Sequence, residues 1–279
     1  MITAAIRAAL TTVVALVLAS GVASAESALD RIKERGKLVV GVKQDYRPWG
    51  FLDENGNIVG LEIDLAKDVA ERLDVEVELV PVVASNRMEF LEQGQIDLII
   101  ATMGDTEQRR EVVGMIEPAY YAGGTNVLAP KSASLSAWQD LQGKDVCAIQ
   151  GAYYNKRVSQ EYQPNLVAFA GIPEATAALQ NGNCIAFLYD NTWIESQLAG
   201  DPQWADYEMP LETEDLQVWA LAIPLDQLEE PYGDFVREAV TDWHRSGMLI
   251  ELNRDWGIQD NPFLQEMHEQ HKSSRGAPD

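Results

Sequence analysis

The chain alternates short apolar segments with amphipathic segments in two separate stretches, and this rhythm restricts its possible folds most. In the first stretch, runs typical of buried strands cover residues 38–42, 77–82 and 96–101, and helical patterns cover 61–73 and 86–93. In the second, strand-like runs cover 146–150, 166–169 and 185–188, and helical patterns cover 156–162, 172–180 and 191–198. Such alternation predicts two open parallel sheets, each covered by helices.

Two apolar extended segments, 127–129 and 219–223, lie where the chain leaves the first stretch and where it returns. Helical patterns follow over 232–244 and 248–256, so we expect the first and last parts of the chain to share one lobe. Two crossings between lobes make a hinge. The predicted division is a signal peptide over 1–25, lobe 1 over 26–128 and 221–260, lobe 2 over 129–220, and a polar, partly frayed tail over 261–279.

The N-terminus carries the features of a secretory signal peptide. Arg7 precedes an apolar run over residues 8–19, and Ala23-Ser24-Ala25 has the small-x-small pattern of a cleavage site. We expect cleavage near Ala25 and a soluble protein in the periplasm, because the apolar run is too short for a lasting transmembrane anchor. An uncleaved anchor is the alternative. No cysteine stands beside the cleavage site, which argues against lipid attachment.

The chain is strongly acidic, with 44 Asp and Glu against 21 Lys and Arg and a formal net charge of -23. This charge repels nucleic acid and anionic lipid headgroups, so neither is expected as a partner. An anionic ligand would need a local concentration of positive side chains. All three histidines, His244, His268 and His271, lie near the C-terminus. We expect His268 and His271 in a solvated tail rather than at a metal site, and we expect no cofactor.

Ligands of open parallel sheets bind beyond the carboxyl ends of the strands, and this rule selects a few loops. The loops of the first half carry three cations, a hydroxyl and aromatic rings: Lys43, Arg87, Arg109, Thr102, Tyr46 and Trp49. The loops of the second half offer backbone amides after Gly151 and one carboxylate, Asp190. An α-amino acid needs a bidentate cation for its carboxylate and an anion for its ammonium group. The planar fork of arginine suits the first role.

Each candidate also has a purely structural interpretation. Arg109 is equally compatible with a solvated helix charge beside Arg110. Asp190 is compatible with a cap for the helix that begins at Asn191. Tyr46 and the tryptophan that follows it are compatible with ordinary core aromatics. Spacing alone leaves these alternatives open.

Seven short motifs stand in the order found in one known family. They are VGVK at 40–43, YRPW at 46–49, GLEIDLA at 60–66, NR at 86–87, GQIDLI at 94–99, TEQR at 106–109 and EPAYY at 117–121. With them the chain resembles the bacterial extracellular solute-binding proteins of family 3, up to Trp256. The resemblance implies a type II periplasmic binding protein fold, with two doubly wound α/β lobes joined by a two-stranded hinge. It also implies capture of a polar amino acid for the permease of an ABC importer. We expect a monomer.

The resemblance assigns roles to the candidates that would meet the α-groups of the amino acid. Arg109 resembles the arginine that grips the α-carboxylate, and Asp190 the acid that takes the α-ammonium group. Thr102 resembles a hydroxyl or backbone contact after the third strand. Tyr46 resembles the aromatic lid over the ligand.

The side-chain preference would depend on Lys43 and Arg87, which together resemble members that take aspartate or glutamate. Cysteine binders also show an element like Asn86-Arg87, so cysteine or another polar amino acid is the alternative ligand. Two departures from the family pattern bear on the pocket. Gly104 stands where a Ser or Thr is usual, and Tyr153 stands where small hydroxyl residues are usual. We therefore expect a bulky, aromatic second-lobe wall that includes Tyr153.

The two cysteines, Cys147 and Cys184, would begin the first and third strands of the second lobe. These strands are neighbours in a doubly wound sheet, so the two Cα atoms could lie within about 7 Å. An exported protein permits a disulfide. We predict one, worth about 3 kcal/mol, at the end of the sheet away from the cleft.

Enzymatic turnover and a sensory role are the rival functions. The chain shows no Ser-His-Asp order, phosphate loop or zinc-binding helix, so we assign no catalytic residue. Its many carboxylates leave open an elimination such as that of a dehydratase. A sensory role would require a partner that carries the signal across the membrane.

Overall fold

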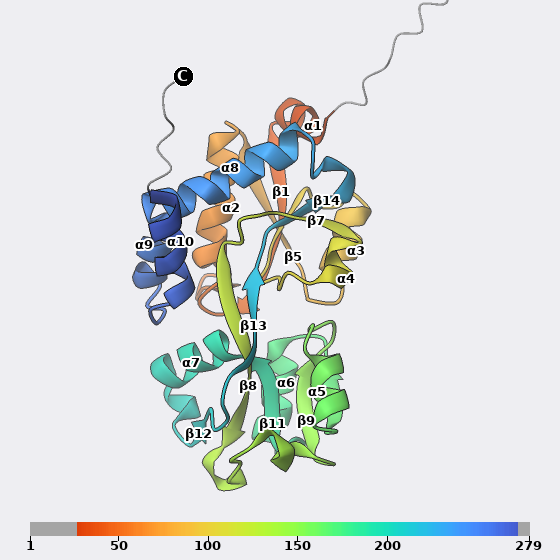
Figure 1. Ribbon diagram of the computed structural model, residues 1–279, viewed down its shortest axis with the longest axis vertical. Helices are drawn as coiled ribbons and strands as arrows, with labels where there is room; N and C mark the ends of the chain where they lie inside the picture. The colour runs from red at the N-terminus through yellow and green to blue at the C-terminus, as the bar shows by residue number, and fades with distance from the viewer. Residues whose placement is uncertain (1–26, 273–279) are drawn as a thin grey trace, which may run out of the picture.

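The computed structural model describes residues 27–272, so the predicted signal peptide lies outside the described residues. These residues form two α/β bodies that are stacked vertically in Figure 1 and connected by two strands. Across residues 27–272, no helix is long and apolar enough to cross a membrane.

Lobe 1, the upper body in Figure 1, contains a five-stranded sheet of order β5-β1-β6-β14-β7. Four of its strands, β5, β1, β6 and β7, run in the same direction, and β14 is antiparallel to both of its neighbours. The strands are β1 Lys37–Val42, β5 Glu76–Pro81, β6 Leu98–Ile100, β7 Val113–Met115 and β14 Ala222–Pro224. A separate small sheet consists of β2 Asp45–Tyr46, β3 Gly50–Leu52 and β4 Ile58–Val59. The helices are α1 Ala28–Arg35, α2 Leu61–Arg72, α3 Arg87–Glu92, α4 Glu107–Arg110, η4 Leu225–Gln227, α8 Pro231–Ser246 and α9 Met248–Asp255.

Lobe 2 contains a six-stranded sheet of order β10-β9-β11-β8-β12, with β13 also paired to β8. The strands β10, β9 and β11 are parallel, and β8 is antiparallel to β11. The strands are β8 Tyr121–Pro130, β9 Asp145–Ile149, β10 Asn165–Phe169, β11 Ala186–Asp190, β12 Tyr207–Glu208 and β13 Glu214–Trp219. The helices are η1 Lys131–Ala133, η2 Trp138–Leu141, α5 Asn155–Glu161, α6 Ile172–Gln180, α7 Asn191–Gly200 and η3 Pro202–Trp204. Two doubly wound α/β lobes confirm the predicted fold class.

The hinge consists of β8 and β13, which run antiparallel between the lobes (Figure 1). Their register pairs Tyr121 with Trp219 and Gly123 with Gln217. Residues 125–128 of β8 already pair with β11 of lobe 2. This pairing indicates that the chain enters lobe 2 before residue 129. From the sequence, lobe 1 was predicted to extend to residue 128. The other predicted lobe boundaries remain a proposal.

Aromatic residues of the two hinge strands pack against one another and against Trp49. Tyr121 stacks on Trp219 with ring centroids 5.2 Å apart, and Trp49 packs edge-on against both. Trp49 is fully buried. The interpretation of Trp49 as an ordinary core aromatic is therefore correct.

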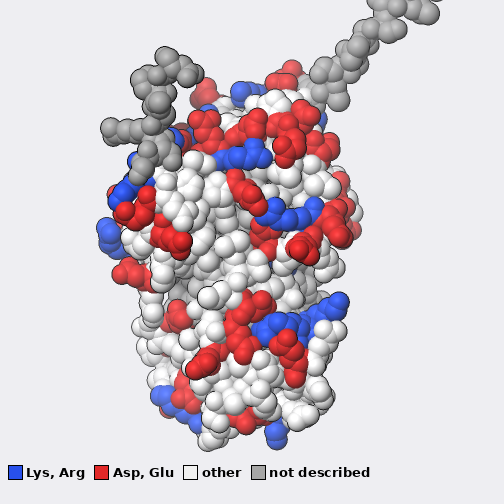
Figure 2. Space-filling model, viewed as in Figure 1, with Lys and Arg blue, Asp and Glu red and all other residues white. Residues whose placement is uncertain are grey.

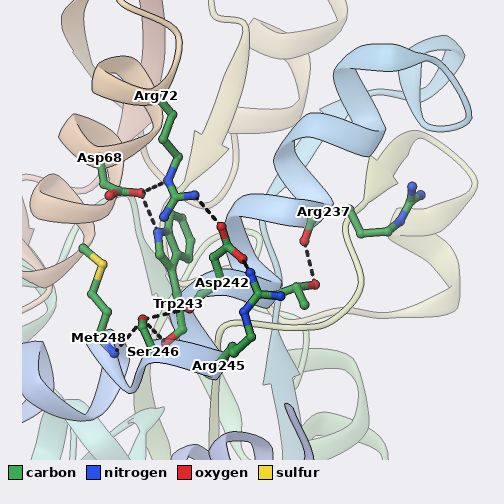
Figure 3. Close-up of polar contacts among 9 residues, drawn as sticks. Asp68, Arg72, Arg237, Asp242, Trp243, Arg245, Ser246 and Met248 are labelled. Carbon is green, nitrogen blue, oxygen red and sulfur yellow. Dashed lines mark hydrogen bonds and ion pairs between the residues drawn. The ribbon is translucent and has the colours of Figure 1, made fainter. Parts of the chain in front are cut away.

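Polar contacts fasten α2 to α8 on the outer side of lobe 1 (Figure 3). The Arg72 guanidinium donates to Asp68 at 2.6 Å within α2 and to Asp242 of α8 at 2.9 Å. The indole Nε1 of Trp243 donates to the same Asp68 oxygen at 2.6 Å. These contacts fix the position of α2 relative to α8. Trp243 itself is fully buried.

The prediction of a frayed tail is wrong for residues 262–272. Helix α10, Pro262–Lys272, packs against α8 and α9 (Figure 1). Leu264 of this helix is buried. Just before the helix, the side chain of Asn261 donates to the carbonyl of Ala122 in the hinge at 2.8 Å. Because few apolar residues mark this segment, its burial depends on the surface that α8 provides.

Candidate functional site

A small cavity of about 30 Å³ lies between the lobes. It is situated beyond the carboxyl ends of β1 and β6 on one side and of β9 and β11 on the other, where open parallel sheets bind ligands. Its lining is Lys43, Ala84, Arg87, Thr102, Arg109, Ile149, Ala152, Tyr153, Tyr154, Tyr189 and Asp190. Every residue predicted to bind ligand is part of this lining except Tyr46.

A larger cavity, of about 540 Å³, lies beside the hinge between α7 and the start of α10. Its described lining includes the carboxylates of Glu195, Asp260 and Glu266 but no Lys or Arg. A ligand carboxylate would find no cation there. The charged side chains that the sequence points to converge on the smaller cavity instead.

Arg109 connects the lobes. It lies on α4, which Thr106 caps, and it is only 8% exposed. Its Nη1 donates to the Gly104 carbonyl at 2.7 Å, and its Nη2 donates to the Gly151 carbonyl of lobe 2 at 3.1 Å. Burial, and then the positive charge of Arg87, lowers the pKa of Arg109 to about 9. A solvated helix charge is therefore excluded for this residue.

Lys43 and Arg87 place two further cations against the cavity, at 1% and 3% exposure. Lys43 Nζ lies 3.0 Å from Oδ1 of Asp45, and the Arg87 Nη1 donates to the carbonyl of Ala101. Burial lowers the pKa of Arg87. Within the described part of the chain, Lys43 Nζ and Arg87 Nε have no hydrogen-bond partner. Arg87 Nε is thus a buried donor without an acceptor, whereas Lys43 Nζ has the ion pair with Asp45.

Among the described residues, Asp190 at the end of β11 is the one carboxylate in the cavity lining. Within residues 27–272 its side chain makes no capping hydrogen bond to α7, which removes the helix-cap alternative. Instead its Oδ2 accepts from the Tyr46 hydroxyl at 2.9 Å. Burial raises the pKa of Asp190 to about 6, against the opposing effects of Tyr46 and the three cations. Tyr46 is fully buried and packs on Tyr189, so it is a core aromatic that also contacts the site.

Thr102 is held by a buried acid that the sequence did not point out. Its backbone has a left-handed φ of 46°, and its amide donates to Oε1 of Glu62 at 2.6 Å. The Tyr120 hydroxyl donates to the same oxygen. Burial raises the pKa of Glu62 to about 7, although these donors and the nearby cations act in the opposite direction. An acid in the first turn of a helix normally stabilises the helix dipole, so its sequence position gave no signal of this role.

An aromatic wall closes the cavity from lobe 2, as the departures from the family pattern predicted. Tyr153 lines the cavity, and its hydroxyl donates to the carbonyl of Asp215 at 3.0 Å. A Cβ at Gly104 would lie 3.1 Å from the Tyr153 ring. Glycine at 104 and tyrosine at 153 are therefore complementary. Sequence reasoning missed Tyr154 and Tyr189, which complete the wall.

The predicted disulfide is present. Cys147 of β9 and Cys184, just before β11, are bonded with their Cα atoms 5.5 Å apart. The carboxyl ends of these strands border the cavity, so the bond lies toward the opposite end of β11. It joins neighbouring strands behind the site.

The histidines lie together rather than in a solvated tail. His271 of α10 stacks on His244 of α8 with centroids 5.5 Å apart, and His268 hydrogen-bonds to the His244 carbonyl at 2.7 Å. Over residues 27–272, no group of three or more His, Cys, Asp or Glu side chains is arranged to hold a metal ion.

Two α/β lobes, a two-stranded hinge and a buried polar cavity between the lobes define a two-lobed ligand-binding protein. The sequence model of the bacterial extracellular solute-binding proteins, family 3, matches residues 38–259, and the chain belongs to this family. Its relatives are amino-acid-binding proteins of ABC transporters.

Individual relatives agree with this class and differ in their ligands. The chain is 28% identical to the ABC transporter glutamine-binding protein GlnH of Bacillus subtilis, over 84% of this chain and 81% of that protein. It resembles the structure of a mutant ArgBP from T. maritima with a TM-score of 0.75 and 30% identity, covering 82% of this chain and 98% of that one. The cysteine-binding protein from Campylobacter jejuni gives a TM-score of 0.77 and 26% identity, with 82% and 92% covered.

Proposed function

We propose that this protein is the periplasmic substrate-binding component of an ABC transporter and that it captures a polar amino acid, with aspartate and glutamate preferred. The observation that carries the proposal is the pair of buried cations, Lys43 and Arg87, which line one cavity with Asp190. Among the described residues Arg87 Nε has no hydrogen-bond partner, and Lys43 Nζ is paired only with Asp45. In this proposal the protein works as a monomer, without a cofactor, and passes the ligand unchanged to its cognate permease.

The α-groups of the ligand are assigned to Arg109 and Asp190. The guanidinium of Arg109 can bind a carboxylate in a bidentate manner. In the structure it donates to two backbone carbonyls, those of Gly104 and Gly151. The carboxylate of Asp190 is an acceptor for an ammonium group. Because these residues belong to different lobes, a bound amino acid would join the lobes through its own two charges.

The side-chain preference is assigned to Lys43 and Arg87. The relatives named above bear names for glutamine and cysteine, which share their α-groups and differ only in the side chain. A preference must therefore come from residues of this chain that the α-groups do not use. A ligand carboxylate could accept hydrogen bonds from both cations, whereas an amide would bring a hydrogen-bond donor against them.

Closure follows from the division of the site between lobes. Lys43, Arg87, Thr102 and Arg109 lie on lobe 1, and Asp190, Tyr153 and the amides after Gly151 lie on lobe 2. Contacts from both lobes exist together only in the closed form. A ligand that makes both sets of contacts therefore shifts the equilibrium toward closure, the form that the permease would recognise.

Isothermal titration calorimetry with purified protein and single amino acids tests the proposal. We expect aspartate and glutamate to bind with micromolar affinity, about 8 kcal/mol, and more tightly than asparagine and glutamine. Arg109→Met should weaken binding at least about a hundredfold, since two charge-assisted hydrogen bonds are lost. The exposed neighbour Arg110→Met is the matched control and should bind as wild type. Tighter binding of the amides would refute the acidic preference, and no binding of any amino acid would refute the function.

The enzymatic alternative is tested on the same samples. Incubation of the protein with its ligand, followed by chromatography, should return the amino acid unchanged. Asp190 is the cavity carboxylate that would have to act as the base in an elimination. Conversion that disappears in Asp190→Asn would replace the transport proposal by a catalytic one.

A further inference from the structure

Three consecutive residues of lobe 1 make hydrogen bonds to lobe 2. Asp45 Oδ2 accepts from the backbone amide of Ile172 at 3.1 Å, and the Tyr46 hydroxyl donates to Asp190 at 2.9 Å. The backbone carbonyl of Arg47 accepts from the side chain of Gln197 at 3.2 Å. We call residues 45–47 the closure strip. Its partners Ile172, Asp190 and Gln197 belong to different parts of lobe 2, so the strip stabilises the closed arrangement through three separate contacts.

Asp45 is the member of the closure strip that also contacts the site. Its Oδ1 lies 3.0 Å from Nζ of Lys43, and its side chain is 14% exposed. Its Oδ2 occupies the N-terminus of α6, where Gly171 is the N-cap residue and, within residues 27–272, no side chain of that lobe caps the helix. A Cβ at Gly171 would lie 3.2 Å from this oxygen. The glycine thus leaves room for a carboxylate from the other lobe to cap α6.

We propose that Asp45 is a positioning and specificity-determining residue that couples the charge of the ligand to lobe closure. The inference rests on the proposed function, since it concerns how the same cavity selects its amino acid. One oxygen caps α6 across the lobe interface and favours closure with any ligand. The other oxygen pairs with Lys43 and competes with a ligand carboxylate for it. Asp45 therefore moderates the preference for acidic over amide ligands.

The two roles separate in two variants of the same residue. Asp45→Asn keeps an acceptor oxygen for the Ile172 amide and removes the negative charge beside Lys43. The buried ammonium then gains more from a ligand carboxylate, so the ratio of the asparagine Kd to the aspartate Kd should rise by about tenfold. Asp45→Ala removes the cap as well and should weaken both ligands by a further factor of about five.

Gln197→Ala is the matched control, because it removes another contact of the closure strip without changing any charge. It should weaken aspartate and asparagine equally and leave their ratio at the wild-type value. A merely structural role of Asp45 would likewise move both affinities together. An unchanged ratio in Asp45→Asn, within a factor of two, overturns the specificity role.

Closure itself is measured without ligand, by the radius of gyration from small-angle X-ray scattering. Asp45→Ala should be more expanded than wild type, and Asp45→Asn should match wild type. Equal radii for wild type and Asp45→Ala overturn the capping role. If wild type binds no amino acid, the proposed function fails, but the scattering comparison still decides whether Asp45 holds the lobes together.

Discussion

Replacing the buried acid Glu62 with glutamine should change how stability depends on pH. The carboxyl is fully buried, and its Oε2 has no hydrogen-bond partner among the described residues. Burial raises the pKa of Glu62 from 4.5 to about 7. Because the folded state holds the proton more tightly, the stabilisation is complete below pH 4.5 and is lost as the pH rises through 7. The difference between the two protonation states corresponds to about 3 kcal/mol, at 1.36 kcal/mol per pKa unit.

Glu62→Gln keeps an acceptor for the Thr102 amide and the Tyr120 hydroxyl but never ionises. Its packing and hydrogen-bond changes are the same at every pH, so they cancel when two pH values are compared. Urea unfolding at pH 4.5 and pH 8.5 should therefore show the variant gaining about 3 kcal/mol over wild type at the higher pH. Glu71→Gln, at an exposed site of the same helix, is the control. An equal difference between variant and wild type at both pH values would refute the reasoning.

Three shorter predictions concern other parts of the fold. Replacing both Cys147 and Cys184 with alanine removes a disulfide across a sequence separation of 37 and should lower the free energy of unfolding by about 3 kcal/mol. Denaturation that matches oxidised wild type would contradict this. Gly151→Ala adds a Cβ 2.9 Å from the backbone of Ala84 in the other lobe, at a φ of 80°, so calorimetry should show about tenfold weaker ligand binding rather than wild-type affinity. Burial lowers the pKa of His244 to about 4, so wild type should lose stability as the pH falls from 6.5 toward 4, and His244→Gln should lose about 3 kcal/mol less over that range. Parallel acid unfolding of the two proteins would exclude that role.

The strands and the edge of each sheet that carries the site could be predicted from the sequence. Continuous apolar runs such as 96–101 identify buried parallel strands, and parallel topology then fixes which loops meet. For this reason Arg109 and Asp190, far apart in the chain, were expected at one site, and they border one cavity. The positions of Arg109 and Asp190 followed from the order of the strands, without knowledge of any contact between the lobes.

The rest depended on contacts that a linear pattern does not record. Glu62 looks like an ordinary acid of a first helical turn, and only the packing of Tyr120 and Thr102 around it makes it a buried partner of the site. The bond from Asp45 to Ile172 crosses the lobe interface, so neither local sequence predicts it. Helix α10 was missed because its segment is mostly polar and is stabilised by the surface of α8.

The acidity of the whole chain and the positive charge of its cavity are compatible because they act at different depths. Asp and Glu are scattered over the surface of both lobes in the view of Figure 2, where water and salt screen them. Lys43, Arg87 and Arg109 are buried and meet two carboxylates, Asp45 and Asp190, which leaves one positive charge in excess while Glu62 is protonated. An aspartate or glutamate ligand would cancel that excess, whereas a neutral ligand would do so only if Glu62 gave up its proton. The raised pKa of Glu62 makes that release costly below neutral pH, and this is the electrostatic reason for the preference that we propose.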